Sequence, residues 1–391
     1  MISAMAANEM TTLFELPEFR LIPGERKASW GPELDDHVIE FACGTGLLTT
    51  DAARRYYQTQ RIGTMCAYVV PGAITRRRYE IYGELMTWFF IYDDWAEQLG
   101  HYLSPEKVSA LTDTVFTWFA EDEQDVRGLE LPAARSMRGI WEKLQQDTSL
   151  EWRRRLRTEL SGYLNTAADE ATLVRTGRVN PFGKASELRP VATAARPVFT
   201  MAEHSYGIEI PQEVVRHPFL LQAGKTSTIA IAFGNDIIGL KADLLRGIRD
   251  NLVLSLQEEY GGDLQQNVER AAVHFHRAAA ELSALRARFH SAEGLHDPDL
   301  DRRHDVAVYL QILEDWVYEG IKWQLVDTDR YGTTIRLTHQ ENPNQLLALA
   351  ESLPSPNGLH LRPQSASGFP GRRLDATWRG SPESVDTSNL G

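Results

Sequence analysis

The chain has 391 residues and a formal net charge of −13 at pH 7, from 54 acidic and 41 basic side chains. With 42% hydrophobic and 24% charged residues, it has the composition of a folded globular protein. The negative charge argues against a protein that coats nucleic acid, and two cysteines are too few for a disulfide scaffold. No signal peptide and no apolar stretch long enough to span a bilayer are found, so we expect a cytoplasmic protein without a membrane span or nucleic-acid partner.

Apolar residues recur at helical spacing along most of the chain. The first long periodic run follows Pro71, which predicts a helix start there because proline lacks the donor that a first turn leaves unused. Residues 131–175, 219–256 and 264–291 are predicted to be helical, as are residues 309–323. No segment alternates with period two, so the sequence predicts an all-α protein without a sheet.

The last 40 residues differ in composition from the rest of the chain. From Ser352 to Gly391 there are five Pro, five Gly and seven Ser, with few apolar residues, so we expect disorder from about residue 352. We expect an N-terminal segment (1–18), one helical domain (19–335) and a C-terminal extension (336–391).

Two adjacent carboxylates, Asp93 and Asp94, follow an apolar aromatic run, and Glu97 lies one helical turn beyond Asp93. On a helix Asp93 and Glu97 share one face. Unpaired carboxylates near a core are costly, and a hard cation such as Mg²⁺ with oxygen ligands removes that cost. The alternative is a helix that leaves the core, with its acids in solvent.

A second polar group interrupts the apolar run 228–240 and continues beyond it. Asn235, Gly239 and Asp243 are spaced four residues apart and therefore lie on one stripe of one helix. An amide oxygen and a carboxylate two turns apart, with a glycine between them, could bind one small cation. The alternative is a buried asparagine satisfied by backbone, a packing glycine and a surface aspartate.

These two motifs, in this order, resemble the metal motifs of single-domain microbial class I terpene synthases. The aspartate-rich motif corresponds to residues 93–97 and the second motif to residues 235–243. Arg189 lies where this family is similar in placing a diphosphate-sensing arginine, and the pair Arg330–Tyr331 follows a tryptophan-rich last helix. The resemblance implies a class I helical bundle with the active site in its centre. An ordinary helix cap is the alternative role for Arg330 and Tyr331.

The second motif departs from the family pattern at three positions. Gly239 replaces a hydroxyl ligand, Asp243 is one methylene shorter than the usual glutamate, and Ala242 replaces a basic residue. Lys241 is one step away, about 100° around the helix. We expect a working but slow site.

The resemblance implies a lyase that ionises an acyclic prenyl diphosphate, farnesyl or geranylgeranyl diphosphate, and cyclises the carbocation to a hydrocarbon or alcohol. It implies three Mg²⁺ ions, with Mn²⁺ able to substitute, and diphosphate contacts from the two arginines and the tyrosine. The expected metal ligands are Asp93, Asp94, Glu97, Asn235 and Asp243. The expected partners are the prenyl diphosphate substrate and, as one possible assembly, a second copy of the chain in a homodimer.

A carbocation needs a dry cavity whose walls stabilise positive charge without offering a nucleophile, and aromatic faces do so. Phe89, Phe90, Trp316 and Trp323 are the candidates, with ordinary core packing as the alternative for each.

The same helical fold allows two alternatives to a terpene cyclase. An isoprenyl diphosphate synthase should carry a second aspartate-rich motif, which residues 235–243 do not provide. A non-catalytic protein with a decayed metal site is the other alternative, because of Gly239 and Asp243.

Overall fold

The structure, a computed structural model, describes residues 14–21, 30–291, 302–332 and 341–353, and these ranges contain helices but no strand. The expected all-α class is therefore confirmed. In chain order the helices are α2 (Gly31–Gly44), α3 (Asp51–Gln60), α4 (Ile62–Val69), α5 (Arg76–Tyr102), α6 (Pro105–Phe116), the 3-10 helices η1 (Thr117–Phe119) and η2 (Glu123–Asp125), α7 (Pro132–Gln145), α8 (Leu150–Thr176), α9 (Phe182–Ala192), α10 (Ala195–Tyr206), α11 (Gln212–Val215), α12 (Pro218–Arg246), α13 (Leu252–Tyr260), α14 (Leu264–His290), α15 (Arg303–Val326) and α16 (Gln345–Ser352).

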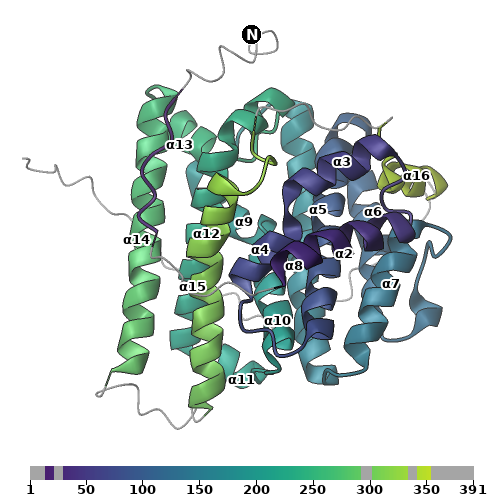
Figure 1. Ribbon diagram of the computed structural model, residues 1–391. Coiled ribbons are helices and arrows are strands. Elements are labelled where there is room, and N and C mark those ends of the chain that lie inside the picture. The colour runs from purple at the N-terminus through teal and green to yellow at the C-terminus, as the bar shows by residue number, and fades with distance from the viewer. Residues whose placement is uncertain (1–13, 22–29, 292–301, 333–340, 354–391) are drawn as a thin grey trace, which may run out of the picture. The chain divides into compact units, whose positions relative to one another are not determined.

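The two motif-bearing helices, α5 and α12, belong to one bundle. Helix α12 packs against α14, α15 and α9, while α5 packs against α2, α8 and α7. In Figure 1, α12 and α15 run side by side, with α14 along one side of the bundle and α7 towards the other.

Three predicted helix limits are corrected by local capping. Helix α5 begins at Arg76 and not at Pro71, because the Thr75 side chain accepts a hydrogen bond from the Arg78 backbone N–H at 3.2 Å and so caps the helix there. The predicted run 131–175 is divided between α7 and α8, and Ser149 caps the second helix.

The predicted run 219–256 is divided as well. Gly247 ends α12 in the left-handed region, at a φ of 74°, where glycine carries no Cβ penalty. Asn251 then caps α13 by accepting a hydrogen bond from the Val253 backbone N–H. The loop 247–251 between the two helices becomes important in the site.

The apolar side of α5 is fixed by aromatic packing. Trp88 is fully buried, stacks on Tyr92 with ring centroids 5.2 Å apart, and meets Trp118 edge to face. Its indole N–H donates to the Ala133 carbonyl oxygen at 3.1 Å, so this ring has no unsatisfied polar atom. This anchoring holds the acidic face of α5 in one orientation.

The chain divides into two units, residues 1–355 and 356–391. Within the first unit, α16 packs on α5 and α6, and the Asn344 side chain donates to the Trp95 carbonyl oxygen at 3.0 Å. The expected disorder from about residue 352 falls almost entirely on residues outside those described, so it stays a prediction, as do the domain limits. Among the described helices, none is long and apolar enough to cross a membrane.

Candidate active site

A cavity opens between α5, α8, α9, α12 and α15, and most of the predicted site residues line it. They are Phe89, Phe90, Asp93, Glu97, Arg189, Asn235, Asp243, Trp316, Trp323, Arg330 and Tyr331. Asp94 is the one predicted residue that does not line the cavity.

The adjacent acids Asp93 and Asp94 have different environments. The Asp93 side chain is 42% exposed and faces the cavity, whereas that of Asp94 is 10% exposed. Asp94 accepts a hydrogen bond from the Tyr57 hydroxyl at 2.6 Å and pairs with the Arg330 guanidinium at 3.0 Å. Asp93 therefore faces the cavity and, among the described residues, pairs with Arg330 alone, while Asp94 is held from two sides by the protein.

The second motif contributes Asn235, Gly239 and Asp243, all from α12, to the wall of the same cavity. The Asn235 amide donates to the Tyr331 hydroxyl at 3.1 Å, and Asp243 accepts from the Asn251 amide at 2.9 Å. Burial raises the pKa of Asp243 to about 6, so at neutral pH it is still mainly a carboxylate.

Gly239 leaves space between these two ligands. A Cβ atom at this position would lie 3.6 Å from the Tyr331 ring and 3.7 Å from the Asp243 carboxylate, which is ordinary contact distance. The space therefore accepts a small side chain or a water molecule beside Asp243.

These donors fit a divalent metal shared with a phosphate group. Within the described part of the chain, no three His, Cys, Asp or Glu side chains are grouped closely enough to hold an ion alone. Mg²⁺ typically takes only one or two carboxylates and completes its shell with water and substrate phosphate. Asp93 and Glu97 from α5 and Asn235 and Asp243 from α12 would supply such ligands.

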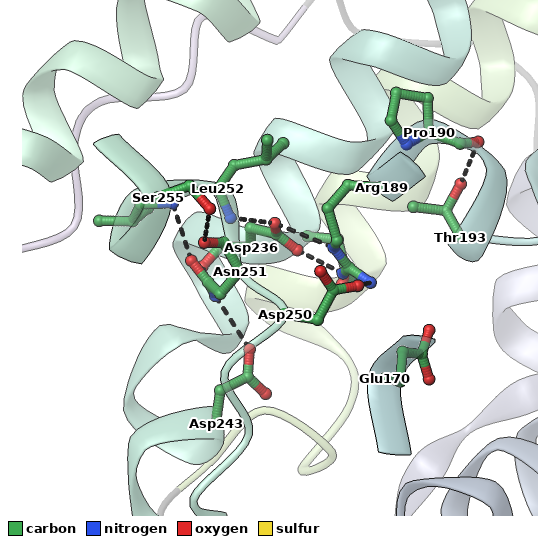
Figure 2. A network of polar contacts seen from close by, with 12 residues as sticks. Glu170, Arg189, Pro190, Thr193, Asp236, Asp243, Asp250, Asn251, Leu252 and Ser255 are labelled. Carbon is green, nitrogen blue, oxygen red and sulfur yellow. Dashed lines mark hydrogen bonds and ion pairs between the residues drawn. The ribbon is translucent and has the colours of Figure 1, made fainter. Parts of the chain in front are cut away.

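Arg189 is held by two buried acids. It donates from Nε and Nη2 to both carboxylate oxygens of Asp236, and from Nη1 to Asp250 at 3.3 Å. Asp236 also accepts the Leu252 backbone N–H at 2.7 Å. Figure 2 shows Arg189 against Asp236 and Asp250, with Asn251 reaching Asp243 from the same loop.

Arg330, in the segment that follows α15, pairs with the aspartate-rich motif of α5. Its Nη2 donates to Asp93 at 2.8 Å and its Nη1 to Gln60 at 3.3 Å, and its guanidinium lies 4.8 Å from the centroid of the Phe90 ring. Because Asp94 also pairs with it, Arg330 is almost fully enclosed, with 5% of its side chain exposed.

The aromatic candidates form one part of the apolar wall, together with methionine, valine and isoleucine side chains. Phe90 and Trp323 lie with ring centroids 5.6 Å apart. The indole N–H of Trp323 donates to the Gln60 carbonyl oxygen and that of Trp316 to the Tyr82 hydroxyl, each at 3.1 Å. Their polar atoms are thus engaged by the protein, and the wall that remains is an aromatic surface.

A family model for terpene synthase family 2, C-terminal metal binding, matches residues 84–281, a range that contains both acidic motifs and Arg189. The chain belongs to the terpene synthase family.

Individual terpene synthases are similar over most of the chain. Pristinol synthase of Streptomyces pristinaespiralis is 28% identical over 303 residues, which are 76% of this chain and 80% of that protein. The 10-epi-cubebol synthase of Sorangium cellulosum is 23% identical over 76% of this chain and 92% of its own. The structure of cucumene synthase matches with a TM-score of 0.67 at 21% identity, covering 78% of this chain and 99% of the other. This terpene synthase therefore has the fold that its motifs predict, and it is an enzyme.

Sequence reasoning missed several polar residues of this terpene synthase. Arg246, Arg249 and Asp250 line the cavity together with Glu170 on α8. Burial, together with nearby Asp250, raises the pKa of Glu170 to about 8, so this side chain is mainly neutral at pH 7. Arg246 continues the stripe of Asn235 and Asp243 by one further turn, and that spacing was the available signal. No sequence pattern pointed to Arg249 and Asp250 in the loop or to Glu170 on α8.

Proposed function

We propose that this terpene synthase is a Mg²⁺-dependent cyclase of an acyclic prenyl diphosphate. The observation that supports it best is that one cavity is lined by carboxylates from α5 and α12, by four arginines of the described residues and by aromatic rings. Bound Mg²⁺ would neutralise the departing diphosphate and act as a Lewis acid. The resemblance suggests three ions, with Mn²⁺ able to substitute.

Four residues are proposed as the principal metal ligands, namely Asp93, Glu97, Asn235 and Asp243. Asp94, which we also predicted as a ligand, is proposed to support Asp93 from behind, since its oxygens bind Tyr57 and Arg330. Arg189, Arg330 and the Tyr331 hydroxyl are proposed to donate hydrogen bonds to the leaving diphosphate, because arginine's planar fork matches phosphate oxygens and stays charged.

The aromatic wall is proposed to stabilise the carbocation. Phe89, Phe90, Trp316 and Trp323 present ring faces whose interaction with a cation contributes about 0.5–2 kcal/mol each. The engaged indole N–H groups leave the wall without an aromatic nitrogen donor towards the substrate. The product would then be a cyclic hydrocarbon, or an alcohol if water captures the final cation.

The fifteen-carbon farnesyl diphosphate is the proposed substrate. Sesquiterpene synthases of Postia placenta and Cyclocybe aegerita are among the relatives, and their name denotes fifteen-carbon products. Geranylgeranyl diphosphate is the second candidate. The cytoplasmic location and the homodimer stay predictions.

The test is incubation of the purified full-length protein with farnesyl or geranylgeranyl diphosphate and Mg²⁺, followed by mass spectrometry of the organic products. We expect a cyclic terpene from the fifteen-carbon substrate. Chain elongation on adding isopentenyl diphosphate would instead indicate an isoprenyl diphosphate synthase. Absence of any product and of diphosphate release from both substrates would refute the cyclase.

A further inference from the structure

Four arginines line the cavity, and they differ in how fully the protein neutralises them. Arg189 is held by Asp236 and Asp250, and Arg330 by Asp93 and Asp94, in each case with at least one pair at hydrogen-bond distance. A guanidinium that already donates hydrogen bonds to two carboxylates has fewer N–H donors and less uncompensated charge to offer to a phosphate group.

Arg246, in the last turn of α12, is different. Its Nη1 lies 3.8 Å from Asp243 and 3.9 Å from Glu97, beyond hydrogen-bond distance from both. Its side chain is 18% exposed, and burial lowers its pKa from the usual value, although an arginine remains charged at neutral pH. Arg246 is therefore a largely desolvated cation between the two metal motifs that, among the described residues, makes no hydrogen bond with its guanidinium.

Arg249 lies three residues further on, in the loop between α12 and α13, and also lines the cavity. Within the described ranges no carboxylate pairs with it. Arg246, beside Glu97 and Asp243, and Arg249, three residues further along the chain, therefore add two positive charges to the cavity wall that are less satisfied than Arg189 and Arg330.

Lys241, the basic residue that the sequence places nearest to the second motif, does not contribute here. Its Nζ lies 4.9 Å from the centroid of the Phe14 ring, and it does not line the cavity. Among the described residues, Arg246 and Arg249 are the basic side chains from the C-terminal end of α12 and the following loop that line the cavity.

We infer that Arg246 and Arg249 form a further diphosphate-binding pair, outside both metal motifs and separate from Arg189 and Arg330. The inference rests on the proposed function, since it names the group of the substrate that these arginines bind. Charge-assisted hydrogen bonds to phosphate oxygens would replace the two long ion pairs of Arg246. Arg246 would then no longer pair with Glu97 and Asp243, the two carboxylates that are proposed to bind metal.

The test measures binding of inorganic diphosphate in the presence of Mg²⁺ to the full-length protein by isothermal titration calorimetry. The variants are Arg246→Gln, Arg249→Gln and the double variant, with Lys241→Gln as a control of the same charge change on the same helix. We expect about a tenfold weaker Kd for each single variant and more for the double variant, with Lys241→Gln unchanged.

Unfolding temperatures measured alongside separate binding from stability. If the glutamine variants fold poorly, Arg246→Lys keeps the charge but not the planar fork, and its Kd should lie between those of the parent and of Arg246→Gln. A parent that binds diphosphate with Mg²⁺ and a folded double variant that binds equally well would overturn the inference alone. A parent that binds no diphosphate would count against the proposed function itself.

Discussion

Arg330 donates a hydrogen bond to the Oδ2 oxygen of Asp93 at 2.8 Å, which joins the proposed leaving-group donor to the proposed metal ligand. The same guanidinium pairs with Asp94 at 3.0 Å. Arg330 therefore places a positive charge beside the aspartate-rich motif. Binding of metal and diphosphate would exchange this internal pair for ion pairs with the ligand.

The first prediction compares the same substitution at adjacent residues. Asp94→Asn should lower the free energy of unfolding by about 1–3 kcal/mol, because Asp94 is buried between Tyr57 and Arg330. Asp93→Asn should change it by less than about 1 kcal/mol, because that side chain is 42% exposed. Urea unfolding of both variants measures the difference, and a larger loss for Asp93→Asn would contradict the assigned environments.

The second prediction concerns the space at Gly239. Gly239→Ser should fold without strain, since a Cβ there meets nothing closer than 3.6 Å, and it should gain a few tenths of a kcal/mol from helix propensity. Its hydroxyl would lie beside Asp243 as an additional oxygen ligand, so the Mg²⁺ concentration for half-maximal rate should fall. Gly224→Ser on the same helix, where the nearest atom is 3.9 Å away, is the control. No difference between the two serine variants in their Mg²⁺ requirement would argue against a metal at this position.

The third prediction concerns Asn251, which caps α13 and donates to the Asp243 carboxylate at 2.9 Å. Asn251→Asp keeps an acceptor suited to the cap but removes this donor and places a second negative charge beside Asp243. We expect a raised pKa for Asp243 and a severalfold higher Mg²⁺ concentration for half-maximal rate. A Mg²⁺ dependence identical to that of the parent would show that the loop does not position Asp243.

The fourth prediction concerns stability and pH, at a residue away from the cavity. Burial, with nearby Glu319 and Glu314, raises the pKa of Asp315 from 3.8 to about 7, and its Oδ2 is buried without a hydrogen bond. Between about pH 4 and pH 7 the folded protein holds a proton that the unfolded chain has released. The contribution of Asp315 to the free energy of unfolding is therefore present below pH 4 and is lost as the pH rises through 7.

The variant Asp315→Asn removes this dependence. It should be close to the parent in stability at pH 4 and more stable than the parent by one to a few kcal/mol at pH 8. Urea unfolding at both pH values measures this, with Asp113→Asn on the exposed face of α6 as a control. A parent that stays the more stable protein at pH 8 would show that Asp315 is ionised in the folded state without cost.

Much of this site could be predicted because helical spacing alone decides which residues share a stripe. The four-residue spacing within each motif predicts that its members line the cavity together, and they do: Asp93 and Glu97 from the first, and Asn235, Gly239 and Asp243 from the second. The environment of each residue depends instead on the neighbouring helices. Asp94 lies 100° around α5 from Asp93, where Tyr57 of α3 meets it, and no local pattern contains that contact.

For the helices, too, the sequence pattern predicted their existence, whereas local contacts determine their limits. Proline and apolar periodicity predicted that helices exist after Pro71 and over residues 219–256, but not where they begin and end. Thr75, Gly247 and Asn251 set those ends through single hydrogen bonds or one left-handed residue. The loop that Gly247 and Asn251 create then carries Arg249 and Asp250 into the cavity wall, which periodicity could not foresee.

The most direct test of the account is the release of diphosphate from farnesyl diphosphate by the full-length protein, measured as a function of Mg²⁺ concentration for the parent and for Asp93→Ala. The account predicts release that requires Mg²⁺, stops when the metal is chelated, and is lost in Asp93→Ala although that variant stays folded. Release by Asp93→Ala at the rate of the parent, or release by the parent without divalent metal, would contradict it.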